Sequence, residues 1–416
     1  MSDKIKIFTI SDHPLSPSGV GTQTKYIIEG MLKTGKYQFI SFGGAMQHPN
    51  HQPQKTEQWG EDWIIWPVDG YGNPDMVRAM INQNKPDILW FMTDPRFYGW
   101  LWQIENEIRV NVPMVYYHVW DNYPYPTFNR PYYLSNDHIA CISKLTYDIV
   151  QNVAPEVDSS YIPHAVDGDI FKPLDPKKSA EFKISKGLGK KFVCFWNSRN
   201  ARRKQSGTLI WWFKEFLDRV GHDNACLIMH TDTKDVHGQD LEAIIAELGL
   251  VNGEVLFSRD KLSAADLSVV YNMADVTLCI SDAEGFGLST LESLSSGTPI
   301  IVNMTGGLQD QVTDGENWYG IGIEPSSKAI IGSQQVPYIY EDRMSKDDFL
   351  DALEKIYNMS TKERHELGLK GSEWARNFFG FDKFIERWDE LFTSIHENKG
   401  SWEHREGYTP YEVRVY

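Results

Sequence analysis

The chain has few cysteines and lacks a long apolar run. No segment approaches the roughly 20 consecutive apolar residues that a membrane-spanning helix needs. The first residues, MSDKIKIFTISDHP, alternate like a strand and lack the basic head and apolar core of a secretory signal. We therefore predict a cytoplasmic protein without a transmembrane segment. The four cysteines lie in apolar strand-like runs without metal-ligand spacing, which predicts buried, reduced thiols: Cys141, Cys194, Cys226 and Cys279.

Positive charge is also in short supply. There are 41 Lys and Arg residues against 57 Asp and Glu residues, so the formal net charge is -16. The overall field repels nucleic acid and anionic membrane surfaces unless a local basic patch overrides it. A nucleic-acid partner is therefore disfavoured, although the charge alone does not exclude one.

The 416 residues exceed the size at which one hydrophobic core keeps growing, which predicts two domains. Apolar strand-like runs alternate with helical or loop material in both halves, as in parallel α/β sheets. In the first half they are residues 4–10, 38–42, 87–92, 113–117 and 138–142; in the second half, residues 191–196, 226–230, 255–257, 276–280 and 299–302. The predicted divisions are an N-terminal domain (1–173), a second domain (174–380), a C-terminal helix (381–396) and a polar tail (397–416). Two such sheets would place their ligand sites across a common cleft.

The segment from Glu284 to Glu292 (EGFGLSTLE) follows a buried strand and carries the strongest chemical signal. Two carboxylates flank a glycine-rich turn that opens a helix. The unpaired N–H groups and the dipole of a helix N-terminus suit a phosphate, and a carboxylate further along can accept hydrogen bonds from ribose hydroxyls. Spacing alone leaves open a capped amphipathic helix with two solvated glutamates.

A basic loop, NSRNARRK, follows the first strand of the second half and supplies Arg199, Arg202, Arg203 and Lys204. Cations at the carboxyl end of a strand could clamp a diphosphate, whose charge grows as a glycosidic bond breaks. A solvated basic loop is the alternative interpretation of such a charge run.

Two elements of the first half also lie at predicted strand ends. Glycines in the turn from Ser18 to Gly21 would let the backbone approach a phosphate closely, although such turns are common in α/β folds. His118 follows another strand and could hydrogen-bond a sugar hydroxyl or shuttle a proton, but a lone histidine is more often a satisfied structural residue.

Together these motifs resemble retaining glycosyltransferases with the GT-B fold, in particular glycosyltransferase family 4. The glutamate pair matches the E-x7-E motif, and SGTPII (296–301) and GGLQD (306–310) follow in the expected order. IPHAVDGDIFKP (162–173) resembles the hinge motif of the family, which also argues against reading its Asp-Gly-Asp as a metal site. Residues 326–342 have no counterpart in this resemblance.

The resemblance implies that Glu284 contacts hydroxyls of the donor sugar and that Glu292 holds the ribose. An arginine and a lysine of the basic loop bind the diphosphate; Arg199 and Lys204 match best, and Arg203 competes for the arginine role. The backbone amides that take the phosphates belong to Gly287, Leu288, Ser289 and Thr290.

In the first half, the resemblance implies that Gly19 lies at the phosphate and acceptor side, with Ser18 in place of the first family glycine. His118 and Asp121 correspond to the His-Asp element that faces the transferred sugar. The expected activity is metal-independent transfer of a hexose, with retention, from a UDP- or GDP-linked donor to a carbohydrate acceptor. The donor is a co-substrate, and neither a metal nor another cofactor is expected.

Two other enzyme classes account for fewer of these motifs, and a binding module is a third alternative. A glycoside hydrolase would use the glutamate pair but leave the basic loop without a role. A nicotinamide oxidoreductase would need a glycine at position 24, where Thr24 stands. A non-catalytic module that binds sugar nucleotides differs from the enzyme only by turnover, and a modified nucleobase in DNA stays open as the acceptor.

Overall fold

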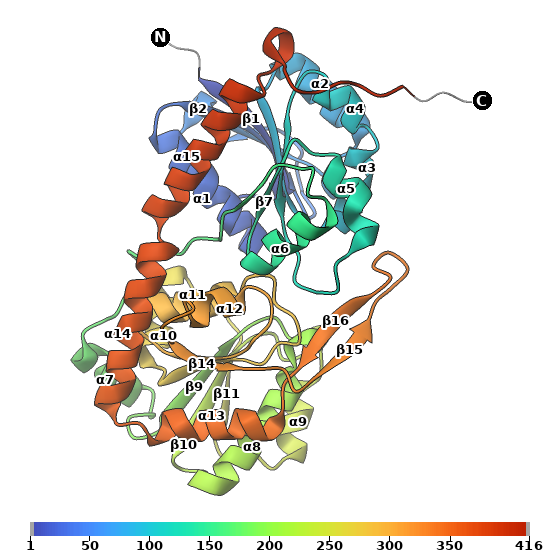
Figure 1. Ribbon diagram of the computed structural model, residues 1–416. Coiled ribbons are helices and arrows are strands. Elements are labelled where there is room, and N and C mark those ends of the chain that lie inside the picture. Colours follow the sequence, from blue (N-terminus) through green and yellow to red (C-terminus); the bar gives the residue numbers. More distant parts are fainter. Residues whose placement is uncertain (1–3, 413–416) are drawn as a thin grey trace. The chain divides into compact units, whose positions relative to one another are not determined.

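A computed structural model describes residues 4–412 of the chain. These residues form two compact units (Figure 1). Unit 1 comprises residues up to Ala165, residues 332–338 and the C-terminal segment from Phe381; unit 2 comprises residues 166–331 and 339–380. The first division thus falls after Ala165, before the predicted boundary at Pro173, and the helix from Phe381 belongs to unit 1.

Unit 1 is built on an eight-stranded sheet with the order β3-β4-β2-β1-β5-β6-β7-β8. All neighbouring strands pair in parallel except β3, which runs antiparallel to β4. The strands are β1 (Ile5–Asp12), β2 (Tyr37–Gly44), β3 (Gln54–Lys55), β4 (Trp63–Pro67), β5 (Ile88–Thr93), β6 (Met114–His118), β7 (His138–Cys141) and β8 (Ser159–Tyr161). Strand β5 is buried along its whole length, as a central strand covered on both faces must be.

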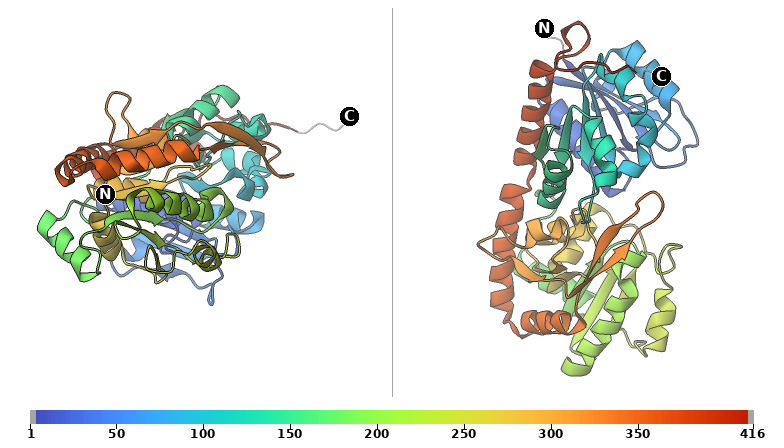
Figure 2. Two further views of the ribbon diagram at one scale, coloured as in Figure 1. Left: turned by 90° about the horizontal axis from the view of Figure 1, so that it is seen from below. Right: turned by 45° about the vertical axis from the view of Figure 1, so that its right-hand side comes forward.

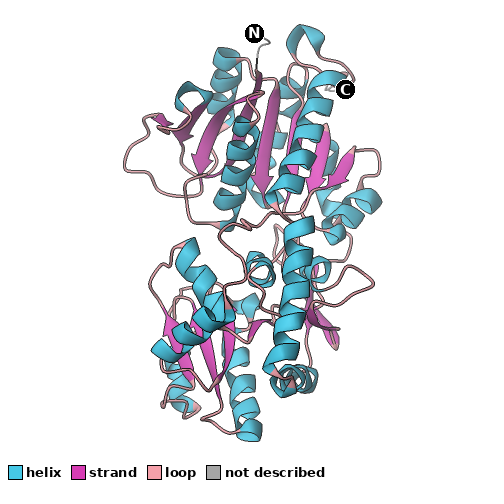
Figure 3. Ribbon diagram, turned by 90° about the vertical axis from the view of Figure 1, so that its left-hand side faces the viewer, coloured by secondary structure: helices cyan, strands magenta, loops and turns pink. Residues whose placement is uncertain are grey.

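Helices pack along the strands of this sheet (Figure 3). They are α1 (Gly19–Lys33), α2 (Pro74–Asn84), α3 (Gly99–Trp102), α4 (Glu105–Arg109), α5 (Arg130–Leu134), α6 (Lys144–Val153) and α15 (Phe381–Asn398). The last helix lies against the first, where a Cβ atom at Gly30 would come within 1.8 Å of the Ile385 side chain. Trp388 of α15 is fully buried, with its ring against those of Trp90 and Tyr117. The C-terminal helix is therefore part of the core of unit 1.

Unit 2 contains a six-stranded parallel sheet with the order β11-β10-β9-β12-β13-β14 and a separate antiparallel hairpin. The sheet strands are β9 (Phe192–Asn197), β10 (Ala225–His230), β11 (Val255–Ser258), β12 (Val276–Cys279), β13 (Ile300–Asn303) and β14 (Gly320–Ile323); the hairpin strands are β15 (Ser327–Ile331) and β16 (Ile339–Arg343).

The helices of unit 2 are α7 (Pro176–Ser185), α8 (Ser206–Val220), α9 (Leu241–Glu247), α10 (Ala264–Met273), α11 (Leu288–Ser295), α12 (Leu308–Val312), α13 (Lys346–Asn358) and α14 (Thr361–Phe378). Helices α8 and α13 lie side by side against the sheet (Figures 1 and 2). Their apolar faces, including Phe213 and Leu353, share one buried cluster with β9, β10 and β12. The expected α/β architecture with two largely parallel sheets is confirmed.

The four cysteines are buried free thiols, as predicted: Cys141, Cys194, Cys226 and Cys279. No helix among residues 4–412 combines the length and the apolar character needed to cross a membrane.

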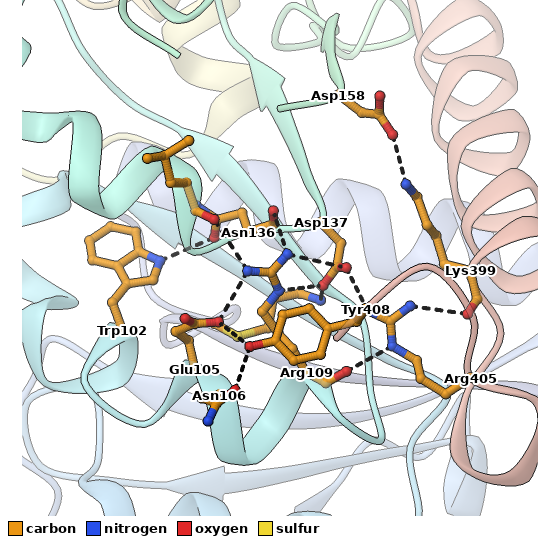
Figure 4. A network of polar contacts seen from close by, with 12 residues as sticks. Trp102, Glu105, Asn106, Arg109, Asn136, Asp137, Asp158, Lys399, Arg405 and Tyr408 are labelled. Carbon is orange, nitrogen blue, oxygen red and sulfur yellow. Dashed lines mark hydrogen bonds and ion pairs between the residues drawn. The ribbon is translucent and has the colours of Figure 1, made fainter. Parts of the chain in front are cut away.

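The predicted polar tail after residue 396 contains an ordered segment that docks on unit 1 (Figure 4). The guanidinium of Arg405 donates to the backbone oxygen of Arg109 at 2.8 Å and to the carboxylate of Asp137 at 2.5 Å. Both side chains of the Arg405–Asp137 pair are only 3% exposed. The Tyr408 hydroxyl adds a hydrogen bond of 2.7 Å to Asn106. A buried ion pair thus fastens the end of the chain to the first domain.

Replacing Arg405 with leucine should lower the free energy of unfolding of unit 1 by about 2 kcal/mol, because it removes a buried guanidinium and its hydrogen bonds, while Asp137 keeps its ion pair with Arg109 at 3.0 Å. Urea denaturation followed by tryptophan fluorescence measures the change. Arg78→Leu is the matched control, since Arg78 forms an ion pair with Glu107 at 2.7 Å on the exposed surface of the same unit. Equal effects of the two substitutions would show that the tail does not stabilise unit 1.

Candidate functional site

The basic loop after β9 delivers two cations to one carboxylate. Lys204 is buried, and its ammonium group forms an ion pair with Glu284. The guanidinium of Arg203 lies 3.8 Å from the same carboxylate and donates to the backbone oxygen of Ala283. Burial works against ionisation of Glu284, but the charges of Lys204 and then Arg203 outweigh it and lower the pKa of this glutamate. The Glu284 side chain is therefore an anion at neutral pH and can accept, but not donate, hydrogen bonds.

Helix α11 begins at Leu288, four residues after this glutamate. Its N-cap is Gly287, which has a left-handed backbone with φ of 93° and no side chain with which to cap the helix. A Cβ atom at this position would lie 2.6 Å from the side chain of Leu308, so only glycine fits without a shift. The first amides of an α-helix have no partner within the helix and bind anions well. The half-buried Leu288 and Ser289 supply two such amides.

The side chain of Thr290 is engaged within the turn. Its hydroxyl has two acceptors within hydrogen-bond distance, the backbone oxygen of Gly287 at 2.8 Å and the side-chain oxygen of Gln311 at 2.7 Å. These bonds commit the buried side chain to holding the turn.

Glu292, one turn into α11, is held by a tyrosine that sequence reasoning missed. The hydroxyl of Tyr271 on α10 donates to the Glu292 carboxylate at 2.9 Å. The same hydroxyl accepts a bond of 2.9 Å from Asn197 at the end of β9. Burial raises the pKa of Glu292 to about 7. Nothing in the spacing of residues 264–273 marks Tyr271, because its role depends on the packing of α10 against α11.

Arg199 is not brought to this site. Its guanidinium forms a two-point ion pair with Asp235, at 2.6 and 3.1 Å, and the side chain is 60% exposed. The expected pairing of Arg199 with Lys204 does not hold in this conformation, because Asp235 occupies the guanidinium. Arg203 takes the place beside Lys204, so the competing assignment is the one the geometry supports.

In unit 1, Gly19 is the first residue of α1 and is exposed. Ser18 caps this helix: its hydroxyl accepts from the amide of Gly21 at 2.9 Å and donates to Asp12 at 2.6 Å. The serine that replaces the first family glycine therefore already occupies one amide of the helix N-terminus. Gly21 is fixed by packing, since a Cβ atom there would lie 2.6 Å from the backbone oxygen of His13.

His118 ends β6 as expected but is fully buried. One ring nitrogen is 2.8 Å from the hydroxyl of Tyr133, and the other is 3.2 Å from that of Tyr116. Burial lowers the pKa of His118 to about 3, so the ring is neutral. In this conformation both nitrogens have protein partners, and the predicted direct contact of His118 with a sugar does not fit.

Asp121, three residues further on, is half-buried. It lies near Arg96, whose pKa is raised chiefly by hydrogen bonds to Asp94 and further by the charge of Asp121. Of the two residues matched to the His-Asp element, Asp121 is the one with partial exposure.

Comparison with known proteins agrees with the motif evidence. Residues 177–374 match the family model described as "Glycosyl transferases group 1". A GDP-mannose-dependent alpha-(1-6)-phosphatidylinositol monomannoside mannosyltransferase from Mycolicibacterium smegmatis is 31% identical over 169 residues, 39% of this chain and 42% of that protein. A D-inositol 3-phosphate glycosyltransferase from Paenarthrobacter aurescens is 28% identical over 139 residues, 33% of this chain and 28% of that protein. The matched region thus spans less than half of each relative.

Solved structures resemble the chain over nearly its full length. Sucrose-phosphate synthase from Thermosynechococcus elongatus superposes with a TM-score of 0.74 at 16% identity, covering 95% of this chain and 100% of that one. An Anabaena protein solved in complex with UDP and glucose gives 0.69 at 15% identity, covering 94% and 100%. These similarities confirm the predicted GT-B fold of two Rossmann-like domains.

The raised pKa of Glu292 predicts a pH-dependent effect of Glu292→Gln. The pKa is about 7 in the folded chain and 4.5 in an ordinary glutamate, so the folded state binds the extra proton. The wild type should therefore lose stability as pH rises from 4.5 to 7, whereas the amide does not titrate. At pH 8 the variant should be more stable than the wild type by on the order of 1 kcal/mol, and the gain should vanish near pH 4.5.

Thermal unfolding at both pH values measures this difference, with Glu373→Gln at an exposed position of α14 as the control. A stability gain that does not change with pH would contradict the assignment of the titrating group to Glu292.

Proposed function

We propose, from the group 1 glycosyl transferase domain at residues 177–374, that this chain transfers a hexose from a nucleoside-diphosphate donor to a carbohydrate acceptor. The observation that carries the proposal is the meeting of Lys204, Arg203 and Glu284 beside the glycine-capped start of α11. Two cations and a helix N-terminus favour a diphosphate, and an ionised carboxylate next to them favours sugar hydroxyls.

In the proposed reaction, Lys204 and Arg203 stabilise the negative charge that grows on the leaving diphosphate as the glycosidic bond breaks. The first amides of α11 bind the phosphate oxygens. Glu284 accepts hydrogen bonds from the sugar and orients it. Because its carboxylate is already bound by two cations, Glu284 is a poor nucleophile, which favours front-face substitution with retention. The leaving phosphate oxygen then takes the proton of the acceptor hydroxyl.

We propose that Glu292 binds the ribose of the donor. A carboxylate one helical turn beyond the phosphate site can accept hydrogen bonds from ribose hydroxyls, as acidic residues do in dinucleotide folds. Tyr271 holds the carboxylate at 2.9 Å in advance, which reduces the entropy lost on binding. Ribose hydroxyls would hydrogen-bond the ionised form, so donor binding should lower the pKa of Glu292.

The donor is a UDP- or GDP-sugar. One relative is named as GDP-mannose-dependent, and one similar structure holds UDP and glucose. The acceptor is a carbohydrate rather than a nucleic acid, a choice that the net charge of -16 supports. We propose that the cations of the basic loop make a metal ion unnecessary at the diphosphate.

Lys204→Met should lower kcat/KM for the donor by about 100-fold, or about 3 kcal/mol, because one charge-assisted contact to the leaving group is lost. The assay is hydrolysis and transfer from UDP-, GDP- and ADP-linked sugars in the presence of EDTA. NMR of the anomeric proton of the product reports retention. The control is Lys214→Met, since this lysine pairs with Asp218 on the surface of α8. Binding of a donor without any turnover would instead identify a sugar-nucleotide-binding module.

A comparison of Arg203→Met with Arg199→Met tests which arginine binds the diphosphate. We expect the larger loss of affinity for UDP or GDP from Arg203→Met, because this guanidinium lies near Glu284 whereas that of Arg199 is paired with Asp235. Isothermal titration measures both affinities. A larger loss from Arg199→Met would show that the basic loop rearranges when the donor binds.

A further inference from the structure

Strand β16 ends in a network of charged groups that reaches the basic loop within unit 2. The carboxylate of Glu341 is only 3% exposed. It accepts hydrogen bonds from both terminal nitrogens of Arg202, one at 2.9 Å, and from Arg343 at 2.9 Å. A buried carboxylate is costly unless it is paired, so these two guanidinium groups account for its position.

The other terminal nitrogen of Arg343 extends the network to the segment that carries Glu284. Its guanidinium lies 2.9 Å from the carboxylate of Asp282, which also accepts from the Gln205 side chain at 2.6 Å. The backbone is joined as well: the amide of Asp282 donates to the oxygen of Arg203 at 2.8 Å, and that of Asp342 donates to the oxygen of Asp282 at 2.8 Å. Strand β16 thus contacts the basic loop directly, through Arg202, and also contacts the segment before Glu284, which is itself bonded to that loop.

The base of the hairpin is itself anchored to the sheet. The hydroxyl of Thr305 donates to the Asp342 carboxylate at 2.7 Å, and the side chain of Asn303, the last residue of β13, donates to the Asp342 oxygen at 2.9 Å. The network therefore connects the basic loop to a strand end that is itself bonded to the sheet. It can thus fix the position of the loop as well as neutralise its charges.

The loop needs such support. Gln205 has φ of 57°, a left-handed conformation that is strained for a residue with a side chain. Its side-chain bonds to Asp282 and Thr208 offset this strain. Arg202 and Gln205 flank the two cations of the proposed site, and acids of the network hold both flanking side chains. The conformation that presents Arg203 and Lys204 is therefore fixed from both ends.

We propose that Glu341 and Arg343 of strand β16 are positioning residues that hold the basic loop in the conformation in which Arg203 and Lys204 bind the donor diphosphate. The inference rests on the proposed function and extends it to Glu341, within residues 326–342, for which the family motifs gave no counterpart, and to the adjacent Arg343. The proposed ribose site lies apart from this network: the Tyr271 hydroxyl bonds to Glu292 and Asn197. We therefore expect Glu341 and Arg343 to affect binding of the diphosphate and not of the ribose.

The test compares the affinities of Glu341→Gln and the wild type for UDP and GDP, and for uridine and guanosine, by titration calorimetry or NMR. The substitution keeps the shape of the side chain but removes the charge that holds two guanidinium groups. We expect roughly tenfold weaker binding of the nucleoside diphosphate and unchanged binding of the nucleoside. A purely structural defect in unit 2 would weaken both ligands.

Glu354→Gln is the matched control, because Glu354 makes an ion pair of 2.6 Å with Arg219 on the same unit, outside the network. Glu341→Gln leaves two guanidinium groups without this carboxylate. Arg343→Lys is a second variant that keeps the number of charges unchanged. The lysine retains the positive charge but cannot bridge Glu341 and Asp282 as a guanidinium does, so it should also weaken the diphosphate selectively.

Unchanged affinity of both variants for the nucleoside diphosphate would overturn the inference while leaving the proposed function intact. Equal weakening of diphosphate and nucleoside would also overturn it. If the wild type binds neither UDP nor GDP, the proposed function fails, and the inference fails with it.

Discussion

The buried ion pair between Lys204 and Glu284 is the interaction on which the site depends. Each of these side chains would be costly to bury alone, and each comes from a different loop at the carboxyl ends of the sheet in unit 2. Their pairing joins the loop after β9 to the turn that opens α11. It also keeps Glu284 ionised, which suits the glutamate to accept hydrogen bonds rather than to act as an acid.

Most of the fold could be predicted from periodicity alone, because parallel strands buried on both faces form apolar runs that stand out from their surroundings. The buried strands β1, β5, β9 and β12 were located in this way. Less buried elements were not: β14 is mostly half-exposed and interrupted by glycines, and β15 has mainly exposed residues. Such strands lack the apolar signal and are fixed by pairing with partners distant in the sequence.

In the site, too, features set by neighbouring residues could be predicted, whereas contacts between residues distant in the sequence could not. The motif around Glu284 correctly predicted a glycine turn that opens a helix, because a local backbone conformation demands glycine at position 287. The sequence of the basic loop does not show which acid pairs with each cation. Arg199 forms an ion pair with Asp235, and Arg202 forms one with Glu341; these acids lie 36 and 139 residues away along the chain. Likewise, no local signal shows that Tyr133 and Tyr116 satisfy His118.

These pairings have a consequence for how an anion would bind. Arg199, Arg202 and Lys204 form ion pairs with Asp235, Glu341 and Glu284, so a diphosphate must compete with these carboxylates. The guanidinium of Arg203 is 3.8 Å from Glu284 and also donates to the backbone oxygen of Ala283. In the proposed reaction Arg203 and Lys204 therefore face two anions, the diphosphate and Glu284. Two cations beside one carboxylate keep the local charge balanced when the second anion binds.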